Sequence, residues 1–114
     1  MKLILTLTLL TTLLISCAKN EAGPFVEPNN GCDTTDLSFN VEIAPILQQN
    51  CVSCHNSPQN NGDFTDYTTV KALADSGILW QRVGVQKDMP PTGPLVGCTL
   101  EQIEAWINSG APEN

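Results

Sequence analysis

The chain has very little positive charge. Its 114 residues include five lysines and arginines against 12 aspartates and glutamates, and removal of Lys2 with the leader described below leaves a side-chain charge of −8. Nucleic-acid phosphates would be repelled by such an excess of acid, so nucleic acid is excluded as a partner and a protein with a basic docking face is favoured. The alternative, which fits the composition equally well, is that the acids simply keep a small domain soluble.

Aromatic residues, strand-like alternation and internal repeats are also scarce. Phe, Trp and Tyr make up 5% of the chain, and no apolar alternation is long enough to predict a sheet. A folded unit of about 80 residues with so few large side chains is only marginally stable from burial alone. The composition therefore predicts a small helical domain that needs an additional internal link to stabilise it.

The longest apolar run, Leu3–Ile15, follows the positive start of Met1 and Lys2. Thirteen residues are too few to cross a bilayer core of about 30 Å as a helix, so residues 1–16 are predicted to be a secretion signal. The stretch Leu-Ile-Ser-Cys ending at Cys17 resembles a bacterial lipobox, in which the cysteine receives lipid after cleavage. An ordinary signal with an incidental cysteine is the alternative.

Residues 17–31 are predicted to be a lipidated, flexible tether because KNEAGPFVEPNNG is polar, contains two prolines and two glycines, and shows no apolar period. The folded domain then covers residues 32–114. We expect it to be anchored by lipid to a membrane, on the periplasmic or exterior side.

The five cysteines can be assigned by function. Cys17 is the lipidation candidate, and Cys51 and Cys54 belong to the motif CVSCH, which leaves Cys32 and Cys98. In an oxidising compartment these two can form one disulfide, closing a loop of about 65 residues and stabilising the fold by roughly 4 kcal/mol. Two unrelated buried thiols are the alternative.

Helical patterns are clearest at the two ends of the domain. Near the C-terminus, Thr99 and Gln102 fit a capping box before an apolar stripe, and Gly110 fits a C-terminal cap. Near its start, apolar residues recur from Phe39 to Leu47 at helical spacing, with Ser38 or Asn40 as the cap and Pro45 either kinking the helix or beginning a second one.

Between these ends the sequence predicts two short helices and two loops. The helices cover Tyr67–Ala74 and Ile78–Val83 and are divided by Ser76-Gly77. The loops cover Asn56–Asp63, which is rich in Asn, Pro and Gly, and Asp88–Gly97, which contains three prolines and two glycines.

The motif CVSCH at residues 51–55 contains two thiols and the only histidine of the chain. A zinc site would need Cys32 and Cys98 as further ligands, and a thioredoxin-like dithiol would need a βαβ setting that the sequence lacks. The spacing suits covalent haem c best: each thiol adds to one vinyl group of the porphyrin, and His55 becomes an axial ligand of the iron.

A sixth ligand for such an iron can be sought among few residues. Met89 is the only methionine besides the initiator, and it lies in DMPPTGP, where the prolines stiffen the loop and extend the backbone of Met89. Such a polar loop is a poor place for a core methionine, so Met89 is predicted to ligate iron, which favours the ferrous state.

From Phe39 to the C-terminus the chain resembles the small single-haem cytochrome c domains of bacterial lipoproteins. The resemblance is carried by Phe39 with IAPIL, then CVSCH, DYTTVKALADSGILWQRV, DMPP and LEQIEAWINSGAPEN. It implies an all-α class I cytochrome c fold of about four to five short helices around one covalent haem, whose first and last helices cross beside it. In that family Cys51 and Cys54 would attach the haem, and His55 and Met89 would ligate its iron. The pair Cys32 and Cys98 departs from many members.

These observations predict an electron carrier that exchanges single electrons with redox partner proteins and is not an enzyme, because no nucleophile stands with a base once His55 is bound to iron. A haem-based sensor with a labile sixth site and a haem relay subunit of a larger redox complex are the alternatives. Trp80 could pack on the porphyrin edge, Tyr67 could hydrogen-bond near the Met89 sulfur and Arg82 could pair with a propionate, whereas core filling or solvation explains these three equally well. Trp106 is predicted to be core.

Overall fold

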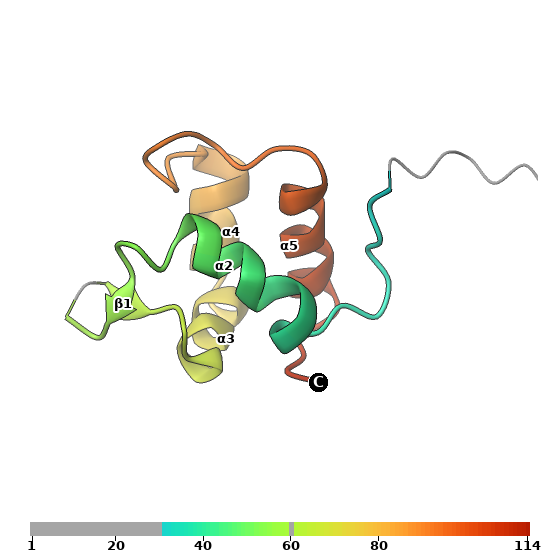
Figure 1. Cartoon of the computed structure of the whole chain (residues 1–114), viewed down its shortest axis with the longest axis horizontal. Helices are drawn as coiled ribbons and strands as arrows, with labels where there is room; N and C mark the ends of the chain where they lie inside the picture. Colours follow the sequence, from blue (N-terminus) through green and yellow to red (C-terminus); the bar gives the residue numbers. More distant parts are fainter. Residues whose placement is uncertain (1–30, 60) are drawn as a thin grey trace, which may run out of the picture.

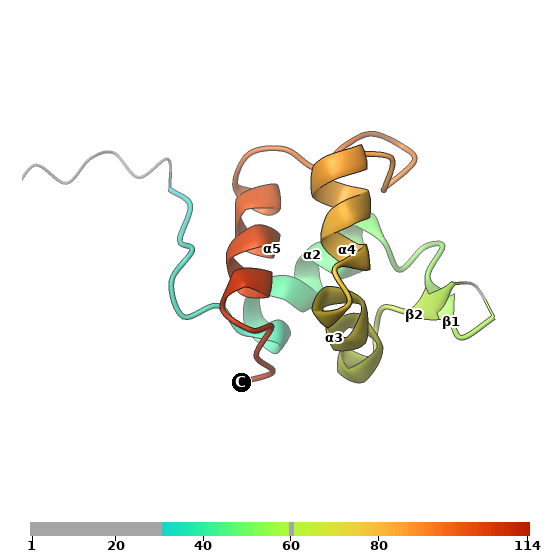
Figure 2. The ribbon, with the colours of Figure 1, turned by 180° about the vertical axis from the view of Figure 1, so that it is seen from behind.

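The computed structural model describes residues 31–59 and 61–114. This part of the chain forms four helical stretches, two of which each consist of two consecutive elements (Figures 1 and 2). The predicted signal at 1–16 and the lipidation candidate Cys17 lie outside the described residues, as does all of the predicted tether 17–31 but its last residue. No helix in the described part is both long and apolar enough to span a membrane. The helices, in chain order, are η2 (Phe39–Ile43) with α2 (Ala44–Asn50), α3 (Tyr67–Asp75), α4 (Ile78–Trp80) with η3 (Gln81–Gln86), and α5 (Cys98–Asn108).

The prediction of an all-α domain needs one correction. The loop after the CVSCH motif contains a short antiparallel ladder of β1 (Asn56–Ser57) and β2 (Gly62–Asp63), in which Asn56 pairs with Asp63 and Ser57 with Gly62. Two-residue strands are too short to show an alternating apolar pattern, so no periodicity in the sequence indicates them. The domain is therefore helical with one small hairpin.

The first helix begins with a wide turn. Ser38 caps it, because its hydroxyl accepts from the Val41 N–H at 3.1 Å while the Glu42 carboxylate accepts from the Ser38 N–H at 2.8 Å. The π-helical turn η2 gives way to regular α-helix at Ala44, directly before Pro45. Pro45 thus stands in the first turn of α2, where its missing N–H costs least. Of the two predicted caps, Ser38 is correct.

The two predicted middle helices are confirmed, with a left-handed residue between them. Asp66 caps α3 by accepting from the Thr69 N–H at 2.8 Å, and this bond, together with one from the Thr69 hydroxyl, lowers the pKa of the carboxyl. Gly77 has φ +78°, a value that glycine adopts without steric cost, and it turns the chain into α4.

The last helix differs from its prediction at one end. α5 begins at Cys98 after Gly97, no side chain caps it, and Thr99 lies inside its first turn, so the predicted capping box is wrong. At the other end Gly110 (φ +94°) is the predicted cap. The Gly110 N–H bonds to the Ile107 carbonyl at 3.0 Å and the Ala111 N–H to the Trp106 carbonyl at 2.9 Å, which is a Schellman motif.

The core sits where η2, α3 and α5 meet. Trp106 is fully buried, as predicted, and its ring lies 6.0 Å from that of Phe39, whose other neighbour is Tyr67 at 5.2 Å. The polar atoms of both outer rings are satisfied by the C-terminal segment: Trp106 Nε1 donates to the Pro112 carbonyl at 2.9 Å, and the Tyr67 hydroxyl donates to the Ala111 carbonyl at 3.0 Å. The first and last helices are therefore in contact, and the C-terminus closes over them.

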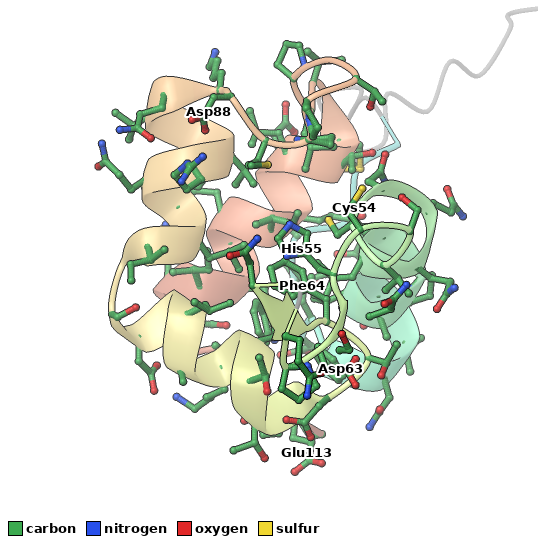
Figure 3. The ribbon with its side chains drawn as sticks, turned by 90° about the vertical axis from the view of Figure 1, so that its left-hand side faces the viewer. Cys54, His55, Asp63, Phe64, Asp88 and Glu113 are labelled. Carbon is green, nitrogen blue, oxygen red and sulfur yellow. A yellow bond between two sulfur atoms is a disulfide. The ribbon has the colours of Figure 1, made fainter. Side chains whose placement is uncertain are left out.

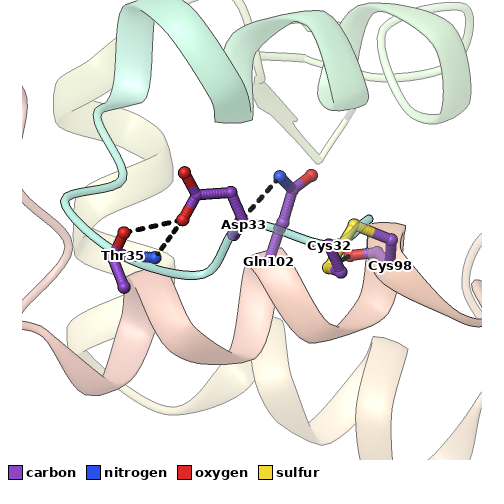
Figure 4. Close-up of a disulfide and its surroundings, with 5 residues drawn as sticks. All are labelled: Cys32, Asp33, Thr35, Cys98 and Gln102. Carbon is purple, nitrogen blue, oxygen red and sulfur yellow. Dashed lines mark hydrogen bonds between the residues drawn. A yellow bond between two sulfur atoms is a disulfide. The ribbon is translucent and has the colours of Figure 1, made fainter. Parts of the chain in front are cut away.

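The N-terminal segment is fixed to the start of α5. Cys32 and Cys98 lie at disulfide distance, with 2.18 Å between the sulfurs and 5.1 Å between the Cα atoms (Figure 4). This is the pairing that the sequence predicted. Next to the bond, Gln102 Nε2 donates to the Asp33 carbonyl at 3.0 Å. The Asp33 carboxylate accepts from the hydroxyl and N–H of Thr35, which lowers its pKa.

Candidate functional site

The CVSCH residues form a tight turn at the end of α2. The Cys51 N–H still bonds to the Leu47 carbonyl at 2.8 Å, and the Cys51 carbonyl accepts from the N–H groups of Cys54 at 3.1 Å and His55 at 2.9 Å. These bonds wrap the backbone around one turn. The two thiols and the imidazole consequently project from a segment that the hydrogen bonds of α2 hold in place.

This turn borders a cavity of about 560 Å³, which is within the usual range of cofactor and ligand pockets. Its walls come from the end of α2, the hairpin region, α3, α4 with η3, and the loop after η3. Cys51, Cys54, His55 and Met89 all line it, so the four residues predicted to hold haem face one space. The other lining residues are Gln49, Asn50, Ser53, Asn61, Phe64, Leu73, Ile78, Leu79, Arg82, Val83, Pro90, Pro91 and Thr92.

The two motif cysteines are free thiols in different surroundings. Cys51 is buried at the cavity wall, and burial raises its pKa to about 11 because the thiolate would lose its hydration. Cys54 is exposed. A redox-active dithiol needs a thiol with a lowered pKa, and the burial of Cys51 shifts its pKa in the opposite direction. Cys51 is therefore not an activated thiol of the kind that such a dithiol uses.

His55 is oriented by two neighbours from the hairpin. Its Nδ1 lies 3.3 Å from the Asn61 carbonyl oxygen, and its ring stacks on Phe64 with centroids 4.4 Å apart and an interplanar angle of 25° (Figure 3). A carbonyl oxygen can only accept, so Nδ1 is the donor in this bond, and in a neutral imidazole Nε2 then has a free lone pair. A protonated Nδ1 bonded to a carbonyl is the usual arrangement of a histidine that ligates a metal through Nε2.

The hairpin geometry that presents the Asn61 carbonyl depends on two left-handed residues. Asn61 has φ +61° and Gly62 has φ +106°. A Cβ at Gly62 would lie 3.2 Å from Thr69 Cγ2 and 3.5 Å from the Phe64 ring, so both conformation and space favour glycine here. The His55 carbonyl also accepts from the Phe64 N–H at 2.9 Å, which ties the motif to the hairpin.

Met89 reaches the cavity from a separate loop. It is half-buried against the core and lies between η3 and α5, 34 positions beyond His55 in the chain. Asp88 directly precedes Met89 in the chain, and its carboxylate accepts from Arg82 Nε at 2.8 Å. This bond lowers the pKa of Asp88. Fold topology, not sequence proximity, brings the thioether to the same cavity as the imidazole.

Comparison with known proteins was negative. No family model, no curated protein and no solved structure matches the chain. The resemblance to cytochromes c therefore stays a prediction from the motifs, and the chemistry of the site has to be argued from its geometry.

The position of Cys32 and Cys98 argues against the zinc alternative. It required Cys32 and Cys98 together with the motif, and these two are placed at bonding distance from one another at the start of α5. Among residues 31–59 and 61–114, no three His, Cys, Asp or Glu side chains gather where they could hold a metal ion. Iron in a porphyrin needs no such cluster, because the macrocycle supplies four of the ligands.

The other three residues suggested for the site, Tyr67, Trp80 and Arg82, do not all line the cavity. Tyr67 donates its hydroxyl to the Ala111 carbonyl and does not line the cavity, which favours the core-filling alternative. Trp80 is not part of the cavity wall and covers Gly84 instead. Arg82 does line the cavity, yet it is paired with Asp88. The sequence reasoning missed Phe64, for which the only signal was that it is the sole aromatic residue between the motif and α3.

Proposed function

We propose that the protein is a monohaem c-type cytochrome that transfers single electrons. The observation that carries the proposal is the convergence of Cys51, Cys54 and His55 from one turn with Met89 from a distant loop around a single cavity. Two thiols three positions apart, a following imidazole and a thioether are the groups that covalent haem with His/Met ligation requires.

The residues present fit a haem c in three further respects. The cavity has the volume of a cofactor site, and its walls include side chains such as Phe64, Leu79 and Val83, which suit an apolar macrocycle. Donation from His55 Nδ1 to the Asn61 carbonyl would leave Nε2 of the neutral imidazole free. The contact between the first helix and α5 agrees with a class I cytochrome c arrangement.

Each residue would have a defined task in this protein. Haem supplies a one-electron Fe(III)/Fe(II) couple when bound. Cys51 and Cys54 would hold it through thioethers, which need neither a free thiolate nor a disulfide. The Asn61 carbonyl and the Phe64 ring would keep the His55 imidazole in one orientation, and a proton held on Nδ1 raises the basicity of Nε2 toward iron. Met89 would supply soft sulfur, which raises the reduction potential.

A test of attachment uses the second cysteine pair as its control. In cells that export the chain and attach haem, the Cys51→Ala/Cys54→Ala variant should lose covalent haem, whereas Cys32→Ala/Cys98→Ala loses the same number of cysteines and should keep it. A pyridine haemochrome spectrum and the intact mass count haems in each protein. A colourless wild-type protein with free thiols at 51 and 54 would refute the proposal.

The two haem-based alternatives are separated by the sixth ligand and by assembly. In an electron carrier, carbon monoxide should leave the ferrous spectrum unchanged, and Met89→Ala should make it responsive, while Thr92→Ala in the same loop should not. A wild-type protein that binds carbon monoxide readily would instead favour a sensor. A relay subunit would purify with other redox proteins, and an isolated monomer argues against it.

We also propose that lipid on Cys17 holds this domain at a membrane on the periplasmic or exterior face. The support comes from the leader and the Leu-Ile-Ser-Cys stretch of the sequence alone. Redox partner proteins with basic docking faces would suit the acidic domain. Intact mass after detergent extraction should show a diacylated or triacylated N-terminal cysteine, and Cys17→Ser should release the protein from the membrane fraction or block its maturation.

A further inference from the structure

We infer that Arg82, through its ion pair with Asp88, is a positioning residue that holds Met89 at the cavity. The inference rests on the proposed His/Met haem site. The proposed ligation assigns the Met89 thioether to iron but does not say what holds its proline-rich loop in place, and the inference concerns that loop.

Arg82 contacts the start of the Met89 loop in two ways. Its carbonyl accepts from the N–H groups of Lys87 and, at 3.2 Å, of Asp88, while its Nε donates to the Asp88 carboxylate at 2.8 Å. Asp88 is the residue directly before Met89. The Arg82 main chain therefore holds the backbone of Lys87 and Asp88, and the Arg82 side chain holds only the carboxylate of Asp88, the position that leads into the ligand.

The rest of the loop leaves this contact as the main polar anchor near Met89. Lys87 turns the chain with φ +56°, and beyond Met89 the Gly93 N–H bonds to the Pro90 carbonyl at 3.1 Å, which holds only the turn that follows. The next strongly buried residue is Leu95. If the pair were broken, the Lys87–Met89 stretch would keep only backbone bonds to the end of η3, and Met89 would leave the cavity more often.

The chain contains a matched control pair. Lys71 Nζ lies 2.7 Å from the Asp75 carboxylate on α3, and neither residue lines the cavity. The exposed side-chain fractions are 33% and 57% for this pair, against 43% and 46% for Arg82 and Asp88. Arg82→Gln and Lys71→Gln each remove one positive charge, and Asp88→Asn and Asp75→Asn each remove one negative charge. The two sets therefore change the total charge of the protein by the same amounts.

The experiment titrates the ferric, haem-bearing full chain with imidazole, which competes with Met89 for iron. Apparent affinity scales with the fraction of molecules in which Met89 has left, and exposed ion pairs shift such equilibria by up to about fivefold. Arg82→Gln and Asp88→Asn should each raise the apparent association constant about two- to fivefold and weaken the Met–ferric iron absorption band. The double variant should change no more than one single variant, because the two residues act as one unit. Both α3 controls should match wild type.

The outcomes separate this inference from the proposed function. Unchanged imidazole binding in both cavity-side variants, or equal changes in the α3 controls, overturns the inference while haem ligation by Met89 stands. Met89→Ala serves as the reference, and if it binds imidazole no more tightly than wild type, Met89 is not a ligand and both ideas fail. A haemochrome spectrum of each variant confirms that haem content is equal.

Discussion

Removal of the Cys32–Cys98 disulfide gives the most direct test of how this small domain is stabilised. Cys32 is 8% exposed, so alanine at both positions avoids burying a new hydroxyl. The bond joins residues 66 positions apart, and the entropy of closing a loop of that length corresponds to about 4 kcal/mol of folding free energy. The folded segment keeps its bond from Gln102 to the Asp33 carbonyl and the burial of Leu37, so most of the loss should come from the freed denatured chain.

The loss can be measured by urea unfolding of the haem-bearing protein. For a slope of about 2 kcal/mol per molar urea, 4 kcal/mol moves the midpoint down by about 2 M. Wild type treated with reductant should unfold at the midpoint of the Cys32→Ala/Cys98→Ala variant, and reductant should not change the variant. A midpoint shift below about 0.5 M would refute the reasoning, because the bond would then not be constraining the denatured chain.

Three further substitutions test local features of the fold. A Cβ at Gly84 would lie 2.5 Å from the Trp80 ring, so Gly84→Ala should displace the indole and lower the free energy of unfolding by about 1 kcal/mol net of its helix-propensity gain, as measured in urea. Asp66→Ala should lower the thermal midpoint at pH 7, and since the folded-state pKa of Asp66 is below its usual 3.8, the difference from wild type should vanish as pH falls through that folded value; a pH-independent difference contradicts the cap. Tyr67→Phe should cost about 1 kcal/mol by leaving the Ala111 carbonyl unpaired and should leave the haem spectrum unchanged, whereas a spectral change would place the hydroxyl near the iron ligand.

Local rules predicted the elements whose cause is local. Ser38, Gly77 and Gly110 act where capping and left-handed geometry demand them, and the helices around them follow. The capping box at Thr99 failed because the disulfide to Cys98 and the φ of +58° at Gly97 start α5 two residues earlier. A tertiary bond thus overrode a pattern that fits many helix starts.

In the candidate site, too, the features with a local cause could be predicted and those that depend on tertiary structure could not. The spacing of Cys51, Cys54 and His55 is fixed within one turn, so their proximity could be predicted from the motif. That Met89 shares their cavity depends on how η3 and the following loop fold back, and the sequence offered only its uniqueness and its prolines as a guide. The stacking of Phe64 on His55 required the hairpin, whose two-residue strands have no periodic signature.

The sulfur bridge has a topological consequence. Because Cys32 and Cys98 are joined, residues 33–97 form a covalent ring, and every residue of the candidate site belongs to it. A protease that nicks the exposed Asn56–Asp63 hairpin would open the ring without separating its halves, so His55 and Met89 would remain parts of one molecule. Such a nicked domain would run as one species on a denaturing gel and would separate into two fragments only after reduction, and a haem bound to Cys51 and Cys54 would then stay with the first fragment.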